Sequence, residues 1–508
     1  MFNFDSMHAL ALLFLTSVLV LWARSRKDSR PYPLPPGPKK LPILGNLFDI
    51  PRKGFIWLDY MEMCRKYALS ENSIIILDSA QAVGDLLEKR SSLYSSRPNS
   101  VMLNELMGWG NMLAMRPNDD IWKAQRRIFT NAIPPSDVKR YHPKQIAATH
   151  ELLRDLAHSD DIIGDLYTWT TVLITDIGYG IQGEEALPFI KTTMEALESI
   201  TLTTTPGAFL VDQIPLLKYV PEWFPGADFK RKAREWSLLR TKMTEDPFRV
   251  TKERTAAGTA TPSLVSVALE QIDLNKDIAQ QEELIKAASA MAHLGATDTI
   301  VSTMGGFILA MLMNPDVQTE AQRELDRVLA PGDLPTFALE PDLPYIQAII
   351  WEVLRHQPVL PLCFPHLSTE DDVYSGYLIP KNSIIMPSIW SILHNKEEHP
   401  DPYRFNPSRF LDTNGKIDPS VKDIGAAFGF GRRACPGKEL GLASLWIGIA
   451  SILTCYRIEP EIDEHGNLAE RKAEWYPGPT ILNRPLPFKC RFVPRSKDVE
   501  ASLDMKFT

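Results

Sequence analysis

The stretch Phe428-Gly-Phe-Gly431-Arg-Arg433-Ala-Cys435-Pro-Gly437 carries more chemical information than any other part of this 508-residue chain. Its glycines allow the backbone to turn tightly before the cysteine. Residues 438–456 follow with the pattern of a helix, so Cys435 is expected near a helix amino terminus, beside two arginines. Such surroundings lower the pKa of a thiol and favour the thiolate that a nucleophile or a soft-metal ligand requires. For a lone cysteine, a buried structural role is the alternative.

The composition fits a large enzyme-sized domain. Apolar residues make up 44% and charged residues 23% of the chain, which is ordinary for a protein that buries a sizeable core. There are 63 acidic and 55 basic residues, and the resulting net charge of −8 argues against general nucleic-acid binding. The 5 cysteines are scattered and odd in number. They form no disulfide framework or zinc pattern, so we expect a reducing compartment.

The amino terminus predicts a membrane anchor. Residues 7–23 are almost entirely apolar, at the lower limit of length for a spanning helix, and four basic residues follow between positions 24 and 30. A cleaved signal peptide is the alternative, but its basic cluster would precede the apolar run. We therefore predict an anchor over 1–23, a basic and proline-rich hinge over 24–40, and a cytosolic body over 41–508.

The body reads as mostly helical with small β-sheets. Helical periodicity is clear over 144–156 and 317–329, whereas strand signals are confined to 74–77, 373–379 and 488–493. No internal repeat is seen. We predict a single large domain.

The strongest helical signal covers residues 282–313. Asp298 is the only acid between 287 and 313, and the pair Gly305-Gly306 interrupts the apolar pattern. A second membrane span is the alternative, but an acid inside a membrane is costly. We predict a long helix in the protein core, where Asp298 needs a functional reason.

The glycine-cysteine stretch matches the F-x-x-G-x-R-x-C-x-G haem loop of the cytochrome P-450 family at all five fixed positions. Three further motifs appear in the family's order: Trp122–Arg126 resembles W-x-x-x-R, Glu352–Arg355 resembles E-x-x-R, and 402–410 resembles P-x-x-F-x-P-x-R-F. The resemblance covers essentially the whole chain. It implies the cytochrome P-450 fold, with a single large haem domain behind an N-terminal transmembrane helix.

The resemblance also implies roles for individual residues. Cys435 would be the axial thiolate of haem b, which favours cleavage of the O–O bond. Glu352, Arg355 and Arg409 would form a buried structural triad. For His366 a capping or surface role is the alternative to haem binding. The residues implied to contact the haem are Trp122, Arg126, His366, Gly431, Arg433 and Gly437.

Residues 295–300 are similar to the family's A/G-G-x-D/E-T-T/S helix segment over the distal face of the iron. Asp298 and Thr299 would form a catalytic acid–alcohol relay for the protons that oxygen activation needs. Alternatively, the Thr299 hydroxyl bonds a backbone carbonyl of its own helix and bends it. Two residues depart from the pattern: Ala296 replaces a glycine, and Ile300 replaces a hydroxyl. The chain also looks several residues short between Tyr67 and Ile74, where the family has room for another strand.

The resemblance implies a haem-thiolate monooxygenase that hydroxylates or epoxidises a lipophilic or aromatic small molecule with O2 as co-substrate. Within the family, the chain resembles fungal microsomal enzymes of secondary metabolism, including tryptamine hydroxylases and O-methylsterigmatocystin oxidoreductases. No dinucleotide-binding fingerprint is seen, so electrons would come from an NADPH–cytochrome P-450 reductase, with cytochrome b5 as an optional second donor. Location in the endoplasmic reticulum membrane, single-pass, follows from the anchor. A haem-thiolate isomerase or dehydratase and a non-catalytic haem-binding sensor are the alternatives, and indole, terpenoid and polyketide substrates all stay open.

Overall fold

The computed structural model describes residues 31–38, 46, 49–67, 74–205, 207–421, 424–462, 467–478, 482–497 and 499–500. The predicted anchor over 1–23, and residues 68–73, where the family has room for a further strand, lie outside these ranges.

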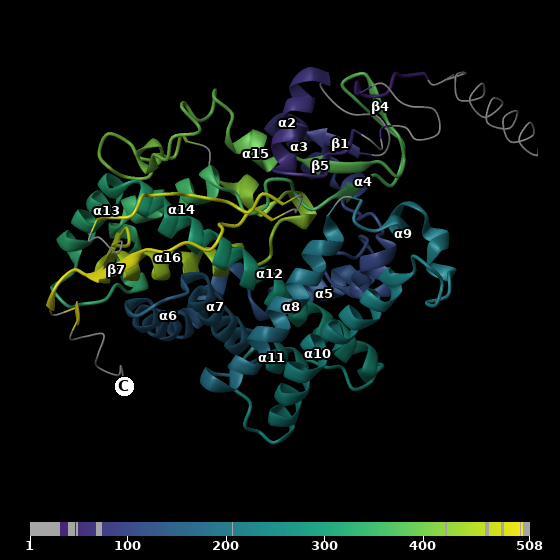
Figure 1. Cartoon of the computed structure of the whole chain (residues 1–508). Helices are drawn as coiled ribbons and strands as arrows, with labels where there is room; N and C mark the ends of the chain where they lie inside the picture. Colours follow the sequence, from purple (N-terminus) through teal and green to yellow (C-terminus); the bar gives the residue numbers. More distant parts are fainter. Residues whose placement is uncertain are drawn as a thin grey trace, which may run out of the picture.

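Helices make up most of the described chain, as predicted (Figure 1). The longer ones are α2 (Ile56–Tyr67), α5 (Asp120–Ala132), α6 (His142–Ala157), α7 (Ile162–Tyr179), α8 (Leu187–Thr204), α10 (Asp228–Ala256), α12 (Ile278–Met313), α13 (Pro315–Val328), α14 (Pro344–His356) and α16 (Lys438–Cys455). The shorter helical segments are α3 (Ala80–Val83), η1 (Gly84–Lys89), α4 (Ser91–Tyr94), η2 (Val101–Leu106), η3 (Trp109–Asn111), η4 (Pro135–Tyr141), η5 (Gly183–Ala186), α9 (Leu210–Gln213), η6 (Pro215–Tyr219), α11 (Leu264–Glu270), η7 (Phe337–Asp342), α15 (Ile389–Leu393), η8 (Pro407–Phe410), η9 (Gly425–Phe428) and η10 (Gly431–Arg433).

The β-structure is limited to small sheets. The three-stranded sheet has the order β1 (Ile74–Leu77), β5 (Ile384–Pro387), β2 (His366–Leu367). Two further sheets have two antiparallel strands each. One pairs β3 (Asp372–Tyr374) with β4 (Tyr377–Ile379), and the other pairs β6 (Tyr456–Glu459) with β7 (Arg491–Pro494). The predicted turn lies between β3 and β4, where Ser375 and Gly376 both have positive φ (49° and 82°). The three predicted strand regions are therefore confirmed. Among the described residues, β1 is an edge strand.

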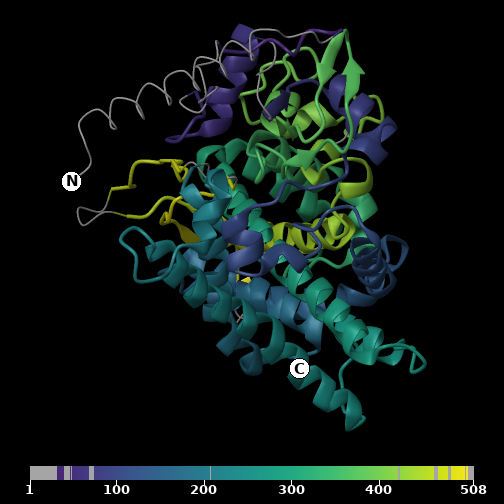
Figure 2. The same ribbon diagram turned by 90° about the vertical axis from the view of Figure 1, so that its right-hand side faces the viewer.

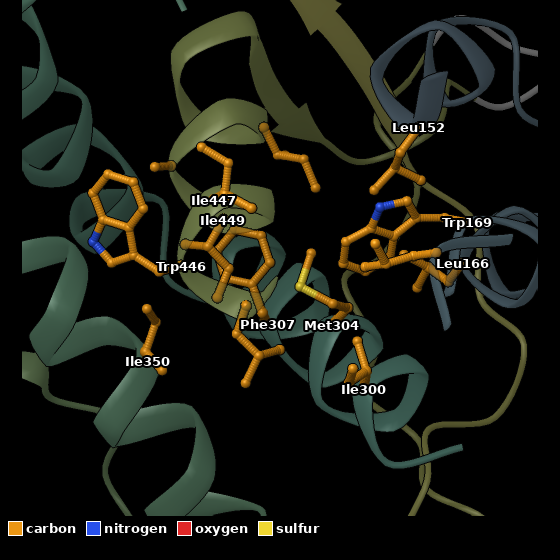
Figure 3. Close-up of a cluster of buried hydrophobic side chains, with 14 of the residues drawn as sticks. Leu152, Leu166, Trp169, Ile300, Met304, Phe307, Ile350, Trp446, Ile447 and Ile449 are labelled. Carbon is orange, nitrogen blue, oxygen red and sulfur yellow. The ribbon is translucent and has the colours of Figure 1, made fainter. Parts of the chain in front are cut away.

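The predicted core helix is confirmed as α12. Together with α16 it is long and apolar enough to cross a bilayer by composition, but most of both helices is buried inside the protein. Figure 3 shows Ile300, Met304 and Phe307 of α12 between aromatic and aliphatic side chains of α7 and α16. Gly448 of α16 allows this close approach, since a Cβ there would lie 3.2 Å from the Cε of Met304.

The β1-β5-β2 sheet, the β3–β4 hairpin and α2 gather at one end of the molecule, α10 and α11 lie at the other, and β7 lies beside α16 (Figures 1 and 2). The described part of the hinge, residues 31–38, packs against the sheet end. Pro35 and Pro38 are buried, and the Leu378 amide of β4 donates to the Pro33 carbonyl at 2.8 Å. This proline segment is therefore attached to the body.

Candidate active site

The cysteine loop is closed by its own backbone. The Cys435 amide donates to the Phe428 carbonyl at 2.7 Å, and α16 begins three residues later. Gly431 has a φ of +54°, and a Cβ on it would overlap the backbone carbonyl of Leu87 in η1. A glycine is therefore required at this position by the close approach of η1 as well as by the turn.

The pKa of Cys435 does not follow the sequence expectation. Burial raises the pKa of the thiol, while a hydrogen bond from the Gly437 amide and the charge of Arg126 on α5 lower it less strongly. The expected lowering of this pKa by the helix end and the adjacent arginines was therefore wrong, because desolvation of the thiol outweighs the groups that lower it. The cation that lowers the pKa of Cys435 is Arg126, which lies far from the cysteine loop in the sequence.

The thiol nevertheless has room for a partner. Cys435 keeps the accessible surface of an exposed residue although protein surrounds it closely enough to raise its pKa. Gly295, in the middle of the otherwise buried α12, is likewise exposed. Both residues are therefore accessible within mostly buried parts of the chain.

The structure brings Trp122, Arg126 and Arg433 together, as the sequence predicted. The Arg433 guanidinium stacks on the Trp122 ring with 4.3 Å between its Cζ and the ring centroid. Arg126 donates from Nη2 to the Ala434 carbonyl at 2.8 Å. Among the described residues, Arg433 donates to the backbone carbonyls of Ser95 (2.7 Å), Leu113 (3.2 Å) and Arg116 (2.8 Å).

Sequence reasoning missed a third guanidinium at this place, that of Arg97. It is buried and donates to the carbonyls of Ala114, Phe364 and Pro365 at 2.8 to 3.1 Å. Burial lowers the pKa of Arg97 to about 10. Burial, then the charges of Arg97 and Arg126, lower the pKa of Arg433 to about 9. One signal was available: Arg97 is the only charged residue between Arg90 and Glu105.

His366 is buried, which rules out the surface alternative. Its Nδ1 lies 2.7 Å from the Tyr94 carbonyl, and its Nε2 has no hydrogen-bond partner among the described residues. Burial, followed by the charge of Arg97, holds the pKa of His366 well below its ordinary value.

These groups fit a ligand that carries carboxylates. In the described part of the chain, no carboxylate lies within ion-pair distance of Arg97, Arg126 or Arg433. Desolvated cations are costly unless an anion pairs with them, and guanidinium groups bind carboxylates in planar geometry. The residues present therefore fit the two propionates of a haem.

The predicted triad is present. Arg355 holds Glu352 through two hydrogen bonds of 2.7 and 2.9 Å within α14, and Arg409 of η8 reaches the same carboxylate at 3.1 Å. Remaining donors of Arg409 bind the carbonyls of Pro400, Asp401 and Arg404. The triad thus fastens the segment before the cysteine loop to α14.

Asp298 and Thr299 do not form a hydrogen-bonded pair. The Thr299 hydroxyl donates to the Gly295 carbonyl at 2.7 Å, so the back-bonding alternative is the one observed. The Asp298 carboxylate points instead to α7, where it accepts from the Tyr167 hydroxyl at 2.5 Å. Consecutive helical residues diverge by roughly 100°, which separates the two side chains. Burial raises the pKa of Asp298, opposed by the Tyr167 hydrogen bond and the charge of Arg484.

The two departures from the family pattern have separate environments. Ile300 is buried in the main core, so an aliphatic side chain suits its position (Figure 3). Ala296 is only partly buried and packs against the same cluster.

Comparisons with known proteins agree with this geometry. The Cytochrome P-450 family model matches residues 35–490. Cytochrome P-450 monooxygenase 98 of Postia placenta is 50% identical over 497 residues, which cover 96% of this chain and 95% of that protein. Tryptamine 4-monooxygenase of Psilocybe cyanescens is 38% identical, covering 95% and 97%, and cytochrome P-450 monooxygenase ple1 of Rhodocybe pseudopiperita is 37% identical, covering 95% and 93%.

Three findings indicate the same family: the loop that presents a cysteine, the desolvated cations around it, and the full-length similarity to monooxygenases. Its members hold haem through a cysteine thiolate and use O2. The chain belongs to the cytochrome P-450 family and is an oxidoreductase of the monooxygenase class.

Proposed function

We propose that this protein is a membrane-anchored haem-thiolate monooxygenase that inserts one oxygen atom into a lipophilic or aromatic small molecule in secondary metabolism. The observation that supports the proposal is the group of buried cations around the Cys435 loop, none of which forms an ion pair with a carboxylate among the described residues. The relatives are fungal monooxygenases, which supports the metabolic setting.

Cys435 would supply the thiolate ligand, and Gly431 and Gly437 would shape the loop that presents it. Trp122, Arg126, Arg433 and His366, joined by Arg97, would hold the propionates. Haem bound there would supply the reductive activation of O2, for which the protein has no side-chain equivalent. A coordinated metal also deprotonates a thiol, which offsets the burial that raises the pKa of Cys435.

Asp298 and Thr299 would handle protons on the other side of the site. Thr299 lies beside the exposed Gly295 and keeps its hydroxyl proton on the Gly295 carbonyl, which leaves its oxygen free to accept a hydrogen bond. Asp298 is buried behind it and can carry one proton as a carboxylic acid. The carboxyl must turn away from Tyr167 to exchange that proton with the open side of α12.

The substrate is proposed to be apolar, and the protein surface that receives it is proposed to adapt to substrates of different shape. A second buried cluster lies between η2, η3, α8, α10 and α12 and is rich in methionine: Met102, Met107, Met112 and Met243. Methionine fills irregular space and adapts to different partners. One relative is a tryptamine 4-monooxygenase, so indoles are the first class to test.

Contact with a membrane is proposed for the segment around η6. Its large apolar side chains are exposed: Leu216, Tyr219, Trp223 (81%) and Phe224. Burial of Trp223 and Phe224 in the core is therefore excluded. Lys218, Lys230 and Arg231 lie close by in sequence and suit anionic lipid headgroups. Together with the anchor predicted over 1–23, the hinge over 24–40 and the body over 41–508, this segment supports the proposed location on the cytosolic face of the endoplasmic reticulum.

The test uses the full-length protein in lipid vesicles, with and without an NADPH–cytochrome P-450 reductase. We expect the red-shifted absorption of the reduced, carbon-monoxide-bound form, NADPH-dependent oxygen consumption and a hydroxylated product from an indole, terpenoid or polyketide panel. Cys435→Ser should abolish the absorption band, whereas Cys490→Ser, at a buried cysteine remote from the loop, should keep it.

Two results would replace the proposal. Product formation without reductant would indicate an isomerase or dehydratase. Spectral shifts with ligands but no turnover across the panel would indicate a haem-binding sensor.

A further inference from the structure

The carboxylate of Asp298 is held from outside its own helix. Tyr167 lies on α7, which packs along α12, and its hydroxyl donates to Asp298 Oδ1 at 2.5 Å. Both side chains are buried. A short, charge-assisted hydrogen bond between buried groups is stronger than an ordinary one.

The position of Tyr167 is well fixed. Its sequence neighbour Leu166 and nearby Trp169 pack against Ile300 and Met304 of α12, as Figure 3 shows. These contacts hold the backbone at Tyr167 in place, so the bond would break if the Asp298 carboxyl turned away from α7.

The bond also sets the charge on Asp298. Burial raises the pKa of this carboxyl, and the hydrogen bond from Tyr167 lowers it, as does the charge of Arg484 from the carboxy-terminal segment. Burial, then the charge of Asp298, raises the pKa of Tyr167, so the phenol keeps its proton and stays a donor. In the described chain, Tyr167 and Arg484 are the ionisable groups that act on Asp298.

We propose that Tyr167 is a positioning residue for proton delivery, which holds the Asp298 carboxylate toward α7 and releases it when it takes up a proton. On protonation, the carboxylate oxygen becomes a weaker acceptor, the Tyr167 bond loses its charge assistance, and the carboxylic acid can turn to the open side of α12. It gives up that one proton there and returns to Tyr167 as a carboxylate. This inference rests on the role proposed above for Asp298.

The test measures the protonation of Asp298 directly in the holoprotein. The infrared C=O stretching band of a carboxylic acid grows as the pH falls, and its absence in Asp298→Asn assigns it. In Tyr167→Phe we expect the midpoint of this band to move up by at least about one pH unit, because a hydrogen bond to a charged group is lost. The alkaline limb of coupled turnover should move up by the same amount, because the protonated form of Asp298 is the one that turns away from Tyr167.

Tyr179→Phe is the matched control. Tyr179 is also buried on α7, but it lies beside His293, with 6.1 Å between the ring centroids, and has no carboxylate partner in the described structure. The band should keep its midpoint in this variant. Equal midpoints in Tyr167→Phe and the wild type, or equal shifts in both tyrosine variants, would overturn the inference.

A second substitution covers the case in which Tyr167→Phe does not accumulate as holoprotein. Site-specific 3,5-difluorotyrosine at position 167 retains the ring and makes the phenol a stronger donor, so the midpoint should fall. An unchanged midpoint would contradict the inference. Absence of the reduced carbon-monoxide band in the wild type would instead count against the haem-thiolate function itself.

Discussion

Arg409 and Glu352 form a buried ion pair across two elements, with 3.1 Å between Nε of the arginine and Oε2 of the carboxylate. Arg355 binds the same carboxylate from within α14, and none of the three side chains is appreciably exposed. The pair links the stretch that precedes the cysteine loop to a helix of the main core.

Removal of one member of this pair should destabilise the protein strongly. Arg409→Ala leaves Glu352 with one cation in place of two and frees three backbone carbonyls, so we expect a loss of about 3–5 kcal/mol in the free energy of unfolding. Chemical denaturation of the holoprotein measures this. Arg323→Ala breaks an exposed pair with Glu320 and should leave the stability unchanged within error. A stable Arg409→Ala protein with full haem would refute the structural role.

Gly431→Ala should disturb the cysteine loop. The new Cβ would overlap the Leu87 carbonyl, and the positive φ adds a strain of about 1–3 kcal/mol. We expect a lower haem content and a lower melting temperature, measured by absorption and calorimetry. Gly441→Ala, in α16 with open space at its Cβ, should be neutral or slightly stabilising. Similar melting temperatures for both variants would contradict the prediction.

Arg433→Gln should weaken haem retention. The variant loses one of the cations proposed to hold the propionates and its stacking on Trp122, and we expect about 10–100-fold faster haem loss to apomyoglobin. Arg433→Lys should rescue only part of this effect, because lysine lacks the planar fork. Arg432→Gln, at an exposed neighbour, is the control. Unchanged haem loss in Arg433→Gln would remove it from the haem site.

His293 should make the protein less stable in acid. Burial lowers the pKa of His293 to about 4, so the unfolded chain takes up a proton below pH 6.5 while the folded chain does not. Stability is therefore lost as the pH falls from about 6.5 to about 4, with a contribution of about 3 kcal/mol from this residue. His293→Gln should flatten that slope, and His158→Gln, an exposed histidine, should not. Denaturation curves at several pH values test this.

Trp223 should report contact with lipid. In the protein reconstituted into vesicles of brominated lipid, we expect tryptophan quenching that falls in Trp223→Phe, since 81% of this side chain is exposed. Trp109→Phe removes a buried ring and should leave the quenching unchanged. If Trp223→Phe also leaves it unchanged, the η6 segment does not enter the bilayer.

The sequence predicted the elements whose signal is local. The apolar run around Asp298 predicted α12, and Ser375-Gly376 predicted the turn of the β3–β4 hairpin. The resemblance to the family, not a spacing rule, implied the triad, and the structure brings Glu352, Arg355 and Arg409 into contact.

What the sequence did not predict depends on contacts between distant segments. Arg97 and Arg433 are far apart in the chain, and only the fold places their guanidinium groups beside each other. The partner of Asp298 lies 131 residues away, so no spacing rule could find Tyr167. The pKa of Cys435 was misjudged for the same reason, since burial is set by the whole fold and outweighs the local charges.

The hydrogen bond between the Leu378 amide and the Pro33 carbonyl has a mechanical consequence. It attaches the proline segment to the β3–β4 hairpin at Pro33. A linker attached in this way limits the rotation of the body as well as its distance from the residues upstream. If a bilayer holds the residues upstream, this attachment would restrict the tilt of the enzyme relative to the bilayer. It would thereby also restrict which side of the molecule faces lipophilic compounds dissolved in the lipid.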